Sequence, residues 1–210
     1  MIPVKILAVQ WIPNASPALC KGLGISPSTP SLGLITTDCD DATYIALDAA
    51  TKQADVAVSY ARSFYAGAAN ASTPHAGEVI GILSAATPGA IRSGMAAATA
   101  ALSQVGFVDC GGVPCLAHTV SSCGTFLSRA AGVPLGSAVA YLIAPPLEAM
   151  VGLDAALKAS DVKLCKLYAP PSETNFGGGL LSGSQSACDA ACDAFTAAVT
   201  AIARNPIDHI

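Results

Sequence analysis

The feature that most constrains this sequence is an internal repeat. The run LDAATKQADV at residues 47–56 returns as LDAALKASDV at residues 153–162, with seven of the ten positions identical at an offset of 106. Two shorter matches flank it in the same order: SLGLI (31–35) with AVAYLI (138–143), and GILS (81–84) with GLLS (179–182). Three ordered matches indicate a duplication. We therefore expect two domains, at residues 1–105 and 106–210.

Each copy is expected to fold as strand, helix, strand, loop, strand and helix. In the first copy, short apolar runs and a stretch rich in Gly, Ala, Asn, Ser and Pro predict strands at 32–36, 55–61 and 78–83, with a loop at 66–76. The helix after the first strand carries one apolar stripe, formed by Ala42, Ile45, Ala46, Ala49 and Ala50. This order of elements implies a sheet with helices packed on it. The predicted fold class is therefore α/β, in the form of an α+β sandwich.

Capping residues predict where the helices begin. Asp38 or Asp40 is expected to cap the helix after the first strand, because a side-chain oxygen accepts hydrogen bonds from the free amides of a first turn. Thr87 followed by Pro88 predicts the start of the last helix of the first copy. The second copy repeats the pattern, with helices predicted at 146–159 and 184–204 and a loop at 170–179.

The low charge of the chain limits its partners. Only 11% of the residues are charged, whereas an average soluble domain has about 25%. The best apolar stretch, residues 130–147, is interrupted by Pro134, Pro145 and Pro146, so no membrane partner is expected. The surplus apolar surface is expected to be buried against other subunits. With a net charge of −4 and no basic run, nucleic acid is not an expected partner.

The eight cysteines are interpreted as reduced thiols of a cytoplasmic protein. The first residues, MIPVKILAVQW, lack the basic start, apolar core and cleavage site of a signal peptide. Cys188 and Cys192, four residues apart in a predicted helix, are interpreted as core packing. Cys110, Cys115, His118 and Cys123 have ligand-type side chains, but their C-x4-C-x2-H-x4-C spacing is not a usual zinc pattern. We favour buried thiols there and predict no metal.

Enzyme motifs are also missing. The sequence has no P-loop, no Rossmann fingerprint, no H-E-x-x-H and no G-x-S-x-G. His75 and His209 lie in a loop and at the C-terminus, and nothing in the sequence pairs them with a thiol. We therefore predict that the protein is not an enzyme and uses no cofactor.

Five long strings resemble one family, and the resemblance extends from about residue 4 to about residue 207. They are DCDDATYIALDAATK (38–52), YAGAANAS (65–72), AGEVIGIL (76–83), YLIAPPLEAM (141–150) and SETNFGGGLLSGSQSACDAACDAF (172–195). The family is that of the tandem-domain, trimeric bacterial microcompartment shell proteins of ethanolamine utilisation. The resemblance implies two circularly permuted microcompartment domains, a flat homotrimer that mimics a hexamer, and tiling with neighbouring shell proteins in a microcompartment shell.

The resemblance also implies two kinds of pore for small metabolites. Loops of both domains gate a central pore, and the matching residues here are Tyr65, Ala66, Gly67, Asn70, Glu173, Thr174, Asn175 and Phe176. Three copies of Glu173 would form an acidic ring that favours cations. Ethanolamine binds at smaller pores, where the matching residues are Asp40, Glu78 and Phe107. Residues 108–122 depart from the family pattern, directly after Phe107.

The residues by themselves leave alternatives open. Spacing alone favours Asp40 as a helix cap and Glu78 as a solvated strand edge, whereas the resemblance favours two carboxylates that bind an ammonium group. A small-molecule-binding regulatory trimer is an alternative to the shell tile, and a thiol enzyme is another. A narrower alternative keeps the shell role but places the protein in a different microcompartment, with choline or another amine or diol as the cargo.

Overall fold

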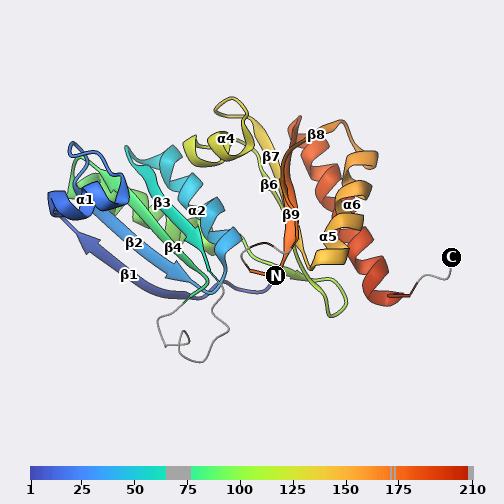
Figure 1. Cartoon of the computed structure of the whole chain (residues 1–210). Helices are drawn as coiled ribbons and strands as arrows, with labels where there is room; N and C mark the ends of the chain where they lie inside the picture. The colour runs from blue at the N-terminus through green and yellow to red at the C-terminus, as the bar shows by residue number, and fades with distance from the viewer. Residues whose placement is uncertain (65–76, 171, 173, 208–210) are drawn as a thin grey trace. The chain divides into compact units, whose positions relative to one another are not determined.

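The computed structural model describes residues 1–64, 77–170, 172 and 174–207 (Figure 1). It contains two compact units. The first-half unit comprises Pro3–Val105 with Gly124–Leu127, and the second-half unit comprises Met1–Ile2, Gly106–Cys123 and Ser128–Ile210. Two α/β units of this kind confirm the predicted fold class. The finer statement, that residues 1–105 and 106–210 are each one microcompartment domain, stays a prediction.

The first-half unit contains one antiparallel sheet in the order β1-β2-β4-β3. Its elements in chain order are β1 (Ile6–Ile12), α1 (Pro17–Leu23), β2 (Ser31–Thr37), α2 (Asp40–Gln53), β3 (Ala57–Ser63), β4 (Val79–Ala85) and α3 (Pro88–Leu102). The second-half unit repeats this order after one extra short strand, β5 (Val108–Asp109). Its further elements are β6 (Pro114–Val120), α4 (Thr125–Ala131), β7 (Ala138–Ala144), α5 (Pro146–Ala159), β8 (Val162–Tyr168), β9 (Gly177–Gly183) and α6 (Gln185–Arg204), with the sheet order β5-β6-β7-β9-β8. The first residues of α4, up to Leu127, belong to the first-half unit.

The predicted strands and helices of the repeat are present, with ends that differ by up to two residues. The prediction of α5 is confirmed at both ends, and the Thr87 hydroxyl accepts a hydrogen bond from Ala90 N as a cap (3.2 Å). The first strand and helix of each unit, β1 with α1 and β6 with α4, were not predicted. A regular alternation of buried and exposed residues is the usual sign of a strand, and β1 lacks it.

The predicted cap of α2 is wrong. Cys39 occupies the N-cap position, and no side chain makes a capping hydrogen bond there. Asp38 accepts a hydrogen bond from Lys5 N instead (2.8 Å), which ties it to the residue before β1. Asp40 is the first helical residue and accepts a hydrogen bond from Asp41 N (2.9 Å). Neither carboxylate caps α2 from the N-cap position: Asp38 binds the backbone before β1, and Asp40 lies inside the first turn.

Side-chain alternation separates the two faces of the first sheet. Gly33 and Gly81 face helices α3 and α2, because a side chain added at Gly33 would collide with Met95 and one at Gly81 with Leu47. On the opposite face, Leu32 and Ile82 pack into a cluster with Cys20 of α1. One sheet therefore carries helices on both faces, as its period of two requires.

Helix α6 forms the core of the second-half unit. Its buried residues, Cys188, Ala191, Cys192, Phe195 and Val199, recur every three or four positions and pack against β6, β7 and α5. Burial of both cysteines confirms their interpretation as core residues. Among the described residues, α6 alone is long and apolar enough to cross a membrane by length and composition. Its buried residues lie along one side, as in an amphipathic helix that packs on a sheet.

Candidate functional site

Asp40 lies in the first turn of α2 with its side chain almost fully buried. Burial raises the pKa of its carboxyl, and hydrogen bonds from the Ser63 hydroxyl and the Asp41 backbone act in the opposite direction. The Ser63 hydroxyl also hydrogen-bonds the hydroxyl of Tyr44, one turn further along α2. The site is therefore a buried carboxylate held by a small polar network between α2 and the end of β3.

Glu78 is held at the start of β4 by its backbone. Its N–H donates to Thr37 O (2.9 Å), and its carbonyl accepts from Phe64 N (3.0 Å). The chain approaches so closely here that a Cβ on Gly77 would lie 1.9 Å from Thr37 O, so this position needs glycine. The pKa of the Glu78 carboxyl is raised by burial first and then by the negative charges of Asp40 and Asp38.

Asp40 and Glu78 thus form a site with excess negative charge. Both ion pairs among the described residues lie elsewhere: Lys52 pairs with Asp48 and Lys158 with Asp154. Burial raises the pKa of both carboxyls and the charge of Asp40 raises that of Glu78 further, so a nearby cation is favoured because it relieves the repulsion and the loss of solvation. This arrangement can hold a small cation.

Phe107 belongs to the second-half unit, so its predicted place beside Asp40 and Glu78 stays a prediction. Its carbonyl accepts a hydrogen bond from Ile2 N (2.6 Å). Its ring packs against Phe176 with centroids 5.6 Å apart at 57°. A residue predicted for the small pore thus contacts a residue predicted for the central pore.

The predicted gating loops are partly outside the described residues. Tyr65, Ala66, Gly67, Asn70 and Glu173 all lie there.

Thr174, Asn175 and Phe176 form a tight turn before β9. Ser172 N donates to Phe176 O (3.0 Å), and Asn175 N donates to Ser172 O (3.3 Å). Asn175 has φ 67, a left-handed conformation that Asn adopts more readily than most residues. This part of the loop is a compact, hydrogen-bonded turn, and its role at a pore stays a prediction.

The four candidate metal ligands do not converge. Cys110 and Cys115 lie across the β5–β6 hairpin with their sulfurs 2.8 Å apart. His118 is three residues from Cys115 on β6, and strand alternation directs the two side chains to opposite faces. Cys123 Sγ donates to Pro134 O instead (3.7 Å). Within the described residues, no three metal-ligating side chains are grouped to hold a metal.

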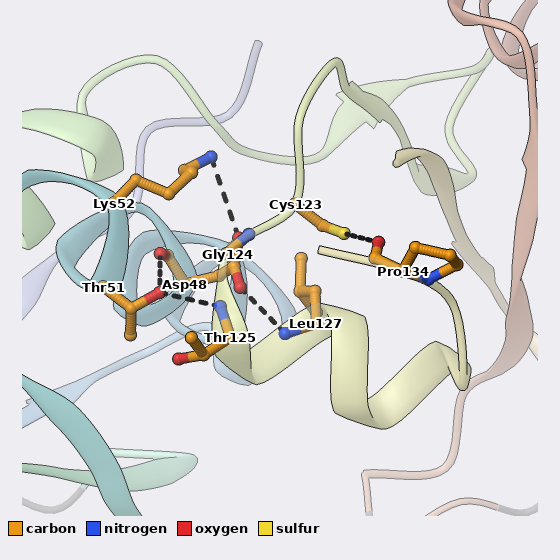
Figure 2. A network of polar contacts seen from close by, with 8 residues as sticks. All are labelled: Asp48, Thr51, Lys52, Cys123, Gly124, Thr125, Leu127 and Pro134. Carbon is orange, nitrogen blue, oxygen red and sulfur yellow. Dashed lines mark hydrogen bonds and ion pairs between the residues drawn. The ribbon is translucent and has the colours of Figure 1, made fainter. Parts of the chain in front are cut away.

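A buried polar cluster surrounds Asp48 and was not predicted from the sequence (Figure 2). The Asp48 carboxylate accepts hydrogen bonds from Gly124 N (2.6 Å) and Leu127 N (2.8 Å), and Lys52 Nζ lies 3.7 Å away. Thr125 N donates to the Thr51 hydroxyl (3.1 Å). The first turn of α4 is therefore capped by α2. The residue before α4 is Gly124, which has no side chain to cap the helix. A short helix that begins after a glycine needs a cap from elsewhere in the chain, and this is the one sign of the cluster that the sequence contains.

Comparisons with known proteins agree with this fold. The family model of the BMC domain matches residues 31–111. The chain is 56% identical to the bacterial microcompartment shell protein EutL of Clostridium perfringens, over 99% of this chain and 97% of that protein. It is 48% identical to the same-named protein of Escherichia coli, over 99% and 96%. The crystal structure of the ethanolamine utilization protein EutL from Leptotrichia buccalis superposes with a TM-score of 0.95, at 55% identity, over 99% of this chain and 98% of that one.

The fold and these relatives define a structural class, the shell proteins of bacterial microcompartments. The chain belongs to the EutL family of that class, a family of ethanolamine utilisation. Its location is the microcompartment shell, and the family predicted from the sequence is confirmed.

Proposed function

We propose that this shell protein forms a homotrimeric, pore-bearing tile, and that Asp40 and Glu78 bind the ammonium group of a small amine such as ethanolamine at a pore. One observation carries the amine proposal. The two carboxyls are buried to different degrees, and the charge of Asp40 raises the pKa of Glu78. A bound monocation would lower the free energy of this site more than that of an exposed carboxylate pair.

The chemistry suits a primary ammonium. Such a group has one positive charge and three N–H donors, and charge-assisted hydrogen bonds to carboxylates are stronger than neutral ones. Ser63 would orient Asp40, since its hydroxyl hydrogen-bonds both Asp40 and Tyr44. The backbone hydrogen bonds of Glu78 would fix where its side chain begins. Phe107 and the two gating loops are included in the proposal on the family resemblance.

We also propose that the chain has no catalytic role and needs no cofactor. Its relatives are shell proteins, and two of its buried thiols, Cys115 and Cys192, have the wrong acidity for a nucleophile. Burial raises the pKa of Cys115 to about 12 and that of Cys192 to about 11. A nucleophilic cysteine needs the thiolate at neutral pH, which requires a pKa shift in the opposite direction.

Exposed apolar residues support assembly. Leu147 and Leu167 are exposed in the single chain, as are Trp11 and Val151. Exposed apolar groups of this size are typical of surfaces that contact other subunits. We propose that they face neighbouring copies or neighbouring shell proteins.

Calorimetric titration with ethanolamine tests the amine site. Asp40→Asn and Glu78→Gln should each weaken binding by at least about tenfold, because each removes a charge from the ammonium. The control is Asp161→Asn, which removes one charge from an exposed position in the other unit and should leave the affinity unchanged. Equal affinities for wild type and both site variants would refute the amine proposal and leave the shell role intact.

A further inference from the structure

Strands β5 and β6 form a tight hairpin that places two cysteines on one face. Val108 pairs with Cys115 across the hairpin, and Cys110 N donates to Val113 O (2.8 Å). Residues two apart on a strand point to the same side, so Cys110 and Cys115 are diagonal neighbours on one face. All four residues belong to the core beside α6 or pack against it, as a shared face requires.

The turn of this hairpin holds the register of the two strands. Gly111 (φ 83) and Gly112 (φ 92) both lie in the left-handed region, as both central residues of a type I′ hairpin turn do. The Asp109 carboxylate accepts a hydrogen bond from Gly112 N (2.5 Å). A slip of the register would place a residue with a side chain in the turn, where positive φ is unfavourable. The two cysteines are therefore kept in one relation to each other.

The two sulfurs are in contact, 2.8 Å apart. A disulfide bond is about 2.05 Å long, so bonding requires the sulfurs to approach by less than about 1 Å. Two sulfurs that each lie about 2.3 Å from one zinc ion would be about 3.8 Å apart, so the observed spacing is too short to hold a metal between them. Both residues are buried, with 3% exposure at Cys110 and 0% at Cys115. This geometry favours a bond within the pair.

We propose that Cys110 and Cys115 form a reversible disulfide, a redox-sensitive lock across the β5–β6 hairpin. The inference is independent of the amine site and of the trimer. The oxidant is a small disulfide such as oxidised glutathione.

The reaction is thiol–disulfide exchange in two steps. One cysteine thiolate of the pair attacks a sulfur of the small disulfide, which gives a mixed disulfide and releases one small thiolate. The other cysteine loses its proton and attacks the protein sulfur of the mixed disulfide, which releases the second small thiolate. The two cysteines together lose two electrons and two protons, and the small disulfide becomes two thiols.

Burial controls how fast this exchange runs. It raises the pKa of the Cys115 thiol to about 12, and the contact with Cys110 acts in the same direction. Because the thiolate is the attacking species, exchange at neutral pH is slow and follows a local opening of the hairpin. Strand β5 has two residues and lies at the edge of its sheet, so few hydrogen bonds must break. The second step is fast by comparison, since the two sulfurs are held together.

The lock lies directly after Phe107. The Phe107 carbonyl accepts a hydrogen bond from Ile2 N (2.6 Å), and its ring packs against Phe176 with centroids 5.6 Å apart. A disulfide from Cys110 to β6 would fix the chain three residues beyond these contacts. Disulfides in the cytoplasm are usually transient and respond to the redox state. The redox state would therefore set how far the segment that carries Phe107 can move.

The first test counts free thiols after the folded chain is equilibrated with reduced or oxidised glutathione. Cys165, which is only partly buried, is replaced by serine to prevent links between copies. Thiols are then alkylated in denaturant, and tryptic peptides are weighed. The peptide 93–129 contains Cys110, Cys115 and Cys123. With oxidised glutathione it should lose two labels and two hydrogens and keep the label on Cys123, and dithiothreitol should restore both labels.

Another peptide of the same digest is the internal control. The peptide 167–204 contains Cys188 and Cys192, which are also buried and close in sequence. These two side chains lie one turn apart on α6, and neither belongs to the hairpin. Both should keep their labels at every glutathione ratio.

The second test is thermal unfolding of the oxidised and reduced forms. Closing this short loop should raise the Tm by about 5 °C, because the link restricts the unfolded chain. Cys110→Ser should abolish both the rise in Tm and the loss of labels. The matched control is Cys188→Ser, which removes a buried thiol from the same core and should retain both effects.

The outcomes separate the pair from other thiol chemistry. Loss of the two labels, restored by dithiothreitol and abolished in Cys110→Ser, supports the proposal. Full labelling of the peptide 93–129 at every glutathione ratio overturns it, as does a link to Cys123 or a glutathione adduct that never resolves. Loss of the labels with an unchanged Tm would overturn the lock. If Cys110→Ser does not fold, the label count of the parent chain still decides.

Discussion

Helices α2 and α5 are copies of one helix, yet they have opposite surroundings. Asp48 in α2 is fully buried and accepts hydrogen bonds from the backbone amides of Gly124 and Leu127, at the start of α4, whereas Asp154 in α5 is exposed and pairs with Lys158. The local sequence is nearly the same, LDAATK and LDAALK. The role of the aspartate is therefore set by which segment covers the helix. Duplication supplied two related helices, and only α2 has its aspartate bound by the start of α4.

The largest expected effect comes from removing the buried carboxylate. Asp48→Ala would leave the amides of Gly124 and Leu127 without their acceptor and should lower the free energy of unfolding by about 3 kcal/mol. Asp154→Ala should change it by less than about 0.5 kcal/mol, because exposed ion pairs contribute little. Urea unfolding of both variants at one protein concentration measures the difference. Equal losses would contradict the contrast between the two helices.

A smaller effect is expected at the glycine that meets Asp48. A Cβ at Gly124 would lie 2.2 Å from Thr51 Oγ1 and 2.6 Å from Asp48 O, so Gly124→Ala should cost about 2 kcal/mol. Gly22 in α1 has open space around it, so Gly22→Ala should be neutral or stabilise by up to about 1 kcal/mol. Thermal unfolding of the two variants decides the point. A harmless Gly124→Ala would mean that the first turn of α4 is not held against α2.

The smallest expected effect is the pH dependence of amine binding, which extends the comparison to the site itself. The second half has Pro146 and Phe176 where the first has Asp40 and Glu78, so one amine per chain is expected.

Burial raises the pKa of both carboxyls, so each holds its proton to a higher pH than an ordinary carboxyl. Since a cation must displace those protons, affinity should fall as pH falls through the raised values, by up to about tenfold per unit for each proton released. Titrations across pH 4 to 8 measure this change. A flat profile, or two amines per chain, would place the binding elsewhere.

The sequence predicted the parts of the fold that carry a periodic signal. The repeat indicated two copies, the apolar stripe of α2 is largely buried, and the Thr87–Pro88 start of α3 is confirmed. The strand β1 and the short helices α1 and α4 escaped prediction. The start of α4 depends on contacts distant in sequence, such as Asp48 with Gly124, which are 76 residues apart. Helix α1 did have local signals, a Ser16 cap and a terminal Gly24, but it is only seven residues long.

The site was predicted from family strings and could not have come from spacing. By spacing, Asp40 is an ordinary helix cap, and this interpretation proved wrong because Cys39 precedes it in the cap position. What distinguishes Asp40 is its burial beside Ser63 and its electrostatic effect on Glu78, 38 residues away. A tertiary contact of this kind leaves no local pattern in the sequence.

The most direct test of the account is the assembly of the purified chain, followed by native mass spectrometry and electron microscopy of negatively stained samples. A shell tile predicts particles of three times 20.8 kDa that associate into flat, ordered sheets. A trimer that never forms sheets at any concentration would contradict the proposed tile and favour a discrete small-molecule-binding oligomer with the same fold. A stable monomer would contradict both.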